Sequence, residues 1–141
     1  MSENTENKLS GLNNTADTTA DFDPKDIEQN KTLSLFAYLG ILVLIPLFGA
    51  KDSKFARFHS NQGLILLIAL VGWAVIYNVL MAIFRAILWN GAGWRLYSLL
   101  GTILSLVYIV FTVLAIIGIV NALNGKAKEL PIIGKYKLLN L

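Results

Sequence analysis

The residues best suited to chemistry in this chain lie in one short stretch, KFARFHSNQG, at positions 54–63. An imidazole can act as a general base or bind a metal, but it needs a nucleophile or further ligands beside it. The chain has one histidine, His59, and no cysteine. Ser53 and Ser60 are close to it in sequence, but no motif orients them. The sequence therefore predicts no catalytic residues, no metal site and no cofactor.

Two interpretations of this stretch stay open. In the first, it is a passive turn: its phenylalanines enter a membrane interface, its cations reach lipid phosphates, and Ser60 or Asn61 caps the following helix. In the second, it is a recognition site whose polar side chains bind a peptide, a lipid phosphate or a partner subunit. Taken together, these interpretations predict contact with a partner or a lipid headgroup at Lys54, Arg57, His59, Asn61 and Gln62.

The elements that must position this stretch are long runs of apolar residues. Only 15% of the residues are charged and 55% are apolar, whereas soluble domains carry about 25% charged residues. A helix of about twenty residues crosses a bilayer, and strict alternation, the mark of a membrane barrel, is absent. The sequence predicts an all-α integral membrane protein with three transmembrane helices, over residues 32–50, 63–89 and 97–124.

The charges divide the chain into two regions. Residues 1–32 carry a net charge of −4, and the rest of the chain carries +7. Residues 1–22 are polar and lack hydrophobic periodicity, so they are predicted to be a disordered acidic arm. Residues 23–141 form the predicted membrane domain, which opens on Asp23 as a helix cap before Pro24 and ends in a basic surface tail, 125–141.

Basic residues also predict an orientation. With three spans, the basic turn 51–62 and the tail lie on the same side, and the positive-inside rule places both in the cytoplasm. The acidic arm then lies outside. If the first run is too short to cross and only dips into the membrane, the arm is cytoplasmic instead. We expect a multi-pass protein of a bacterial cell membrane with a cytoplasmic C-terminus. Nucleic acid is not an expected partner, because lipid phosphates compete for the same lysines.

Small and polar residues recur along one face of the third run. Such residues let helices approach closely and bond across their interface. Asn78 lies in the middle of the second run, where an amide without a hydrogen-bond partner is costly. The residues predicted to mediate helix–helix packing are Asn78, Gly101, Ser105, Tyr108 and Thr112. The alternative is that this polar stripe lines a substrate path.

Three segments, in order, carry a resemblance to a known family: DIEQNKTLSLFAYLGILVLIPLF, KFARFHSNQGL and NGKAKELPIIGKYKLL. Over about residues 26–139 the chain resembles the bacterial relatives of the twenty-kilodalton Tic component of the chloroplast import translocon. This resemblance implies a compact helical membrane domain and a role beside a protein-conducting path.

The predicted function is therefore that of a non-enzymatic small integral membrane protein. We expect it to be a partner-binding component of a membrane translocation or assembly complex. Its expected partners are membrane lipids and either another membrane protein or further copies of itself. The alternative is a small channel or transporter subunit that uses the polar inter-helix stripe.

Overall fold

A computed structural model describes residues 11–140 of the chain. Within that range the fold is all-helical and contains no strand, which confirms the all-α part of the predicted fold class. The chain divides into two compact units: the first comprises residues up to Leu67 and from Leu114 onward, and the second is Ile68–Val113. The elements are η1 (Thr19–Asp21), α2 (Pro24–Ser34), η2 (Leu35–Tyr38), η3 (Gly40–Val43), α3 (Leu44–Gly49), α4 (Lys54–Leu88), α5 (Gly93–Ser105) and α6 (Val107–Leu123).

Helix α2 begins where the sequence predicts. The side chain of Asp23 accepts a hydrogen bond from the backbone N–H of Lys25 at 2.8 Å, and Pro24 occupies the first turn. Asp26 then reaches the start of another helix, because its Oδ2 accepts the backbone N–H of Phe55 at 3.0 Å. A carboxylate is favourable there, since the first N–H groups of α4 have no partner in their own helix. Helix α2 is thereby joined to α4.

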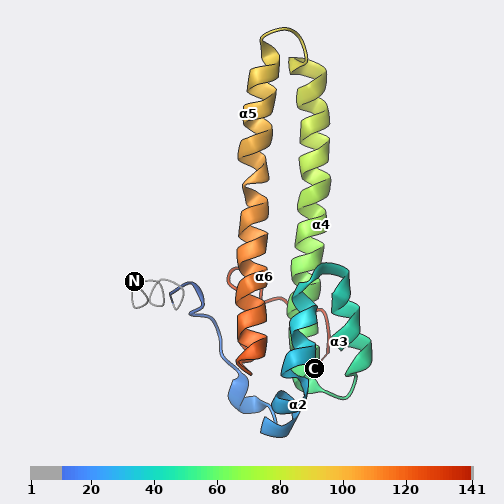
Figure 1. Ribbon diagram of the computed structural model, residues 1–141, viewed down its shortest axis with the longest axis vertical. Helices are drawn as coiled ribbons and strands as arrows, with labels where there is room; N and C mark the ends of the chain where they lie inside the picture. Colours follow the sequence, from blue (N-terminus) through green and yellow to red (C-terminus); the bar gives the residue numbers. More distant parts are fainter. Residues whose placement is uncertain (1–10, 141) are drawn as a thin grey trace. The chain divides into compact units, whose positions relative to one another are not determined.

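The first predicted span, 32–50, is not one helix. It is divided among the end of α2, η2, η3 and α3, and Gly40 adopts a left-handed φ of 64° between the two 3-10 turns. Its apolar helical part is only Gly40–Gly49. This segment is too short to cross a bilayer, because a transmembrane helix needs about twenty residues. In Figure 1 this teal segment folds back beside α2 and the first turns of α4. We call residues 24–62 with the tail 124–140 the lobe.

Two helical stretches are long and apolar enough to cross a membrane among the described residues. They are Lys54–Leu88 and the nearly continuous Gly93–Leu123, of 35 and 31 residues. Only 11% and 17% of their most apolar windows are buried by the protein. Their side chains thus leave large apolar areas uncovered, which favours a lipid environment over the interior of a soluble protein.

The second unit is a helical hairpin made by the later part of α4 with α5 and the start of α6 (Figure 1). Tyr77 and Tyr108 stack edge to face with 5.8 Å between ring centroids. Gly101 lies so close to α4 that an added Cβ would be 2.8 Å from Met81 Cε. These contacts hold the two helical arms of the hairpin together, and residues 89–92 connect the arms.

The described part of the acidic arm packs on the tail. Asp17 and Lys128 form an antiparallel bridge, flanked by hydrogen bonds from Thr18 N to Ala127 O (3.0 Å) and from Glu129 N to Ala16 O (3.1 Å). Two hydrogen bonds from Thr19 lower the pKa of the Asp17 carboxyl. Residues 11–22 therefore differ from the predicted disorder, because their backbone groups find partners in the tail. Residues 1–10 of the predicted arm lie outside the described range.

Candidate functional site

Residues 54–62, predicted as part of a turn, form the first turns of α4. The true turn is shorter and ends at Ser53. Helical geometry directs the polar residues of this stretch to different surroundings: Lys54 is exposed and Arg57 is half-buried, whereas His59, Asn61 and Gln62 are at most 2% exposed. The five residues predicted to contact a partner or headgroup therefore separate into two cations near the surface and three buried polar groups.

The two buried amides hold the tail. Gln62 accepts the backbone N–H of Leu130 and donates to the carbonyl of Gly134, both at 2.9 Å. Asn61 donates to the carbonyl of Tyr136 at 3.0 Å and accepts two backbone N–H groups, from Leu138 and Leu139. The tail has no regular structure to satisfy its own backbone, so these amides replace a hydrogen-bond ladder. We call Asn61 and Gln62 the amide clamp.

His59 is enclosed within the lobe. Its Nδ1 lies 2.7 Å from the hydroxyl of Tyr38, and its ring packs edge to face on Phe55 and Phe58 at 4.6 and 5.3 Å between centroids. Within residues 11–140 no hydrogen bond joins it to Ser60, whose Oγ has no partner, or to Ser53, whose Oγ instead accepts the N–H of Ala56. This arrangement suits a structural core and not a nucleophile–base pair, which requires a hydrogen bond between its members.

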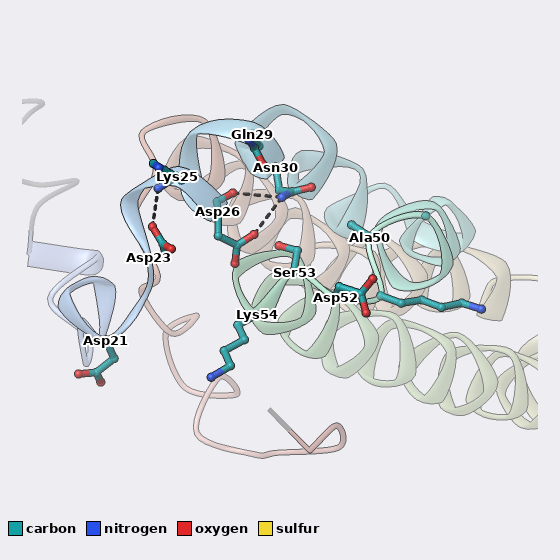
Figure 2. A pocket seen from close by; sticks show the side chains of 12 residues that line it. Asp21, Asp23, Lys25, Asp26, Gln29, Asn30, Ala50, Asp52, Ser53 and Lys54 are labelled. Carbon is teal, nitrogen blue, oxygen red and sulfur yellow. Dashed lines mark hydrogen bonds between the residues drawn. The ribbon is translucent and has the colours of Figure 1, made fainter.

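A polar groove of about 740 Å³ lies between α2 and the turn before α4. Figure 2 shows Asp26 turned toward Asn30, with Ser53 and Asp52 coming from the opposite wall. The Oδ1 of Asp26 accepts from Asn30 at 2.9 Å, while its Oδ2 bonds to α4 as described above. The groove carries charges of both signs, from Asp21, Asp23, Asp26, Asp52, Lys25, Lys51 and Lys54. We call it the mixed-charge groove.

The mixed-charge groove is not arranged as a metal centre. Across residues 11–140, no three histidine or carboxylate groups come close enough together to hold an ion. Three lysines line the groove together with four aspartates, so its lining is not a purely anionic ligand set.

A second, smaller groove of about 310 Å³ lies at the end of α3. Its walls are two apolar and two cationic residues: Leu47, Phe48, Lys51 and Arg57. Arg57 belongs to the predicted contact residues, and Lys51 is a lysine of the same basic turn. We call this the cationic groove. Lys54, the other predicted cation, lines the mixed-charge groove instead.

The predicted packing residues lie in the hairpin, where they behave in two ways. Gly101 and Tyr108 contact residues of α4, as described above. Asn78 instead donates to the carbonyl of Ala74 at 2.7 Å, one turn back in its own helix. The hydroxyls of Ser105 and Thr112 likewise bond carbonyls of their own helical turns, Thr102 O at 2.7 Å and Tyr108 O at 3.0 Å. The cross-helix bond predicted for Asn78 is thus not formed within the described residues.

One comparison with known proteins finds a family that the chain matches. Residues 29–137 match the family model described as the magnetosome magnetite crystal formation protein family, MamF/MmsF. No curated protein and no solved structure matches the chain significantly. The match overturns the resemblance to the Tic component: the same residues that carried it, from α2 to the tail, fall within a different family.

Proposed function

The chain belongs to the magnetosome magnetite crystal formation protein family, since the match covers most of its length, and we propose that it is a non-enzymatic component of the magnetosome membrane. In this proposal it binds partner proteins at the membrane where the crystal forms. Membership of this family supports a role in magnetosome crystal formation, and the two long apolar helices would anchor the chain in the membrane. The translocation role suggested by the Tic resemblance is not retained.

The observation that carries partner binding is the mixed-charge groove. Its two walls come from segments separated in sequence, yet the bond from Asp26 to the N–H of Phe55 joins them. The groove is therefore preformed, and preformed sites lose little conformational entropy when a partner binds. Charges on both walls supply orientation and specificity for a polar segment.

The alternative, a small channel or transporter subunit, receives less support. A polar path needs donors and acceptors that face the moving solute. The hydroxyls of Ser105 and Thr112 and the amide of Asn78 instead bond their own helices, so their hydrogen-bonding capacity is partly used. We therefore place function on the lobe and not on the hairpin.

The test is made in cells that form magnetite crystals. The variant Asp52→Lys with Lys54→Glu exchanges two exposed charges of the groove without removing a hydrogen bond of the fold. We expect it to give crystals whose size and number, measured by electron microscopy, resemble those of a strain that lacks the protein. The control, Lys137→Glu, changes an exposed charge of the tail outside the groove and should restore normal crystals.

Two outcomes contradict this proposal at different points. Normal crystals in the groove variant would show that the groove is not used. Normal crystals in the strain that lacks the protein would remove the crystal-related function itself. In each case, the amount of the chain in purified magnetosome membranes is measured first, so that loss of the protein is not mistaken for loss of its activity.

A second prediction concerns topology. The arm bonds directly to the tail, at the bridge between Asp17 and Lys128, which supports a topology with both on the same side of the membrane. We therefore propose two spans, one supplied by α4 and the other by α5 with α6. This differs from the three-span expectation, which placed the arm and the tail on opposite sides.

The absence of cysteine from the sequence permits a direct measurement of this topology. Single substitutions Asp21→Cys, Lys137→Cys and Asn90→Cys place one thiol on the arm, the tail and the connection between α4 and α5. In sealed vesicles of one orientation, a membrane-impermeant maleimide should label the first two together and should label Asn90→Cys only from the other side. Labelling of the arm and the tail from opposite sides would reinstate three spans.

A further inference from the structure

We propose that the cationic groove binds an anionic phospholipid, while the segment Leu39–Phe48 lies in the interfacial layer of the bilayer without crossing it. This inference rests on the membrane location of the chain and adds a ligand that the proposed function does not require. The occupant is a membrane lipid, whose phosphate contacts Lys51 and Arg57 and whose upper acyl chain contacts Leu47 and Phe48.

The first argument is the uncovered apolar surface of this segment. Its residues are too few to span, yet its large side chains are exposed by 39–68%. They are Leu39, Ile41, Leu42, Leu44, Ile45 and Phe48. So many neighbouring apolar side chains are costly in water. A short helical segment with one uncovered apolar side is typical of a structure that lies in the headgroup and upper acyl layer.

The second argument is the chemistry at the end of the segment. The cationic groove joins two apolar walls to two cations within about 310 Å³. Arg57 offers a planar set of N–H donors that suits a phosphate, and Lys51 adds a second positive charge. Lys51 also lines the mixed-charge groove beside Asp52, but no carboxylate is among the residues that line the cationic groove. Only an amphiphilic anion uses both kinds of wall.

The third argument is continuity. The apolar segment ends where the cations begin, since Phe48 and Lys51 line the same groove. Cationic side chains that border an apolar surface commonly extend to lipid phosphates while their stems stay in the apolar layer. A free phosphate would leave the apolar walls in water, and an apolar protein partner would leave the two charges without counterions.

The experiment uses the purified full chain in a neutral detergent, with Tm followed by tryptophan fluorescence. The probes are short-chain phosphatidylglycerol, short-chain phosphatidylcholine and inorganic phosphate. At saturation, phosphatidylglycerol should raise the Tm by about 5 °C, because a ligand that binds only the folded state stabilises it. The variant Lys51→Gln with Arg57→Gln should lose this shift, and the matched control Lys25→Gln with Lys54→Gln should retain it.

Three results would overturn the proposal: an equal shift with phosphatidylcholine, an equal shift with inorganic phosphate, or a full shift in the cationic-groove variant. The depth of the segment Leu39–Phe48 in the bilayer is measured separately, so that the proposal can still be tested if the cationic-groove variant folds poorly. An environment-sensitive dye on Ile41→Cys, in vesicles, should be quenched by lipids brominated in the acyl chain, and the same dye on Lys137→Cys should not. A water-exposed dye at position 41 would equally refute the interfacial placement. Neither readout involves crystals, so either can fail while the proposed function stands.

Discussion

Replacing Gly63 with alanine is expected to unfold the lobe, whereas replacing Gly72 with alanine further along the same helix should leave it folded. A Cβ on Gly63 would lie 1.8 Å from the carbonyl oxygen of Ala37, and that neighbour is backbone, which cannot rotate away. A Cβ on Gly72 would meet nothing within 4 Å. Helix α4 and η2 must separate in the first variant, and in the second the helix gains about 1 kcal/mol of intrinsic propensity.

The size of the effect follows from the kind of contact. Overpacking a well-packed core costs about 1–3 kcal/mol when side chains can adjust. Here the hydrogen bond between Tyr38 and His59 must move together with Ala37, so we expect a loss of about 3 kcal/mol or more in the free energy of unfolding. Thermal melting in detergent measures it. Equal Tm values for the two alanine variants would show that α4 and η2 are not in close contact.

The sequence predicts the regular parts of this fold well. Asp23 and Pro24 identify the start of α2, and the long uncharged runs identify α4 and the α5–α6 stretch. These features depend on neighbouring residues, so they are readable in one sequence. The break at Gly40 is not readable in this way, because hydropathy sums side chains and takes no account of a backbone that adopts a positive φ.

The hydrogen-bond partners of the polar stretch 54–63 could not be predicted from the sequence. A cluster of polar residues beside apolar runs is conspicuous, yet the groups that Asn61 and Gln62 bind lie 68 to 78 residues away in sequence. No local pattern encodes such a partner. The one available signal was the tail itself, where Pro131 and Gly134 exclude a regular helix and so require some other source of hydrogen bonds.

The mixed-charge groove was missed for a related reason. Asp21 was grouped with the disordered arm and Asp23 was predicted only as the cap of its own helix, whereas no local pattern indicates that Asp26 caps the distant start of α4. The same limitation explains the incorrect family: apolar runs carry little information beyond their hydropathy, so the resemblance rested on a short polar motif. In the structure, Asn61 and Gln62 of that motif hold the tail against α4. The motif therefore indicates a packing arrangement and not an activity.

Replacing Gln62 with leucine is expected to release the tail while the long helices persist. The substitution conserves approximate size but leaves the N–H of Leu130 and the carbonyl of Gly134 without partners, at a position that is 2% exposed. Each unpaired buried group costs about 1–3 kcal/mol. Undocking the tail restores their bonds to water, so the folded lobe loses about 2–4 kcal/mol relative to a state with a free tail.

Limited trypsin digestion at Lys135 and Lys137 measures this release. When opening is fast, cleavage follows the population of the open state, and each 1.4 kcal/mol corresponds to about a tenfold change in that population. We expect cleavage to accelerate by about 30- to 700-fold, with helical circular dichroism almost unchanged. Gln29→Leu is the matched control, because Gln29 is exposed. Cleavage at the control rate would mean that the tail is held without Gln62, by Asn61 or by the apolar contacts of Leu130 alone.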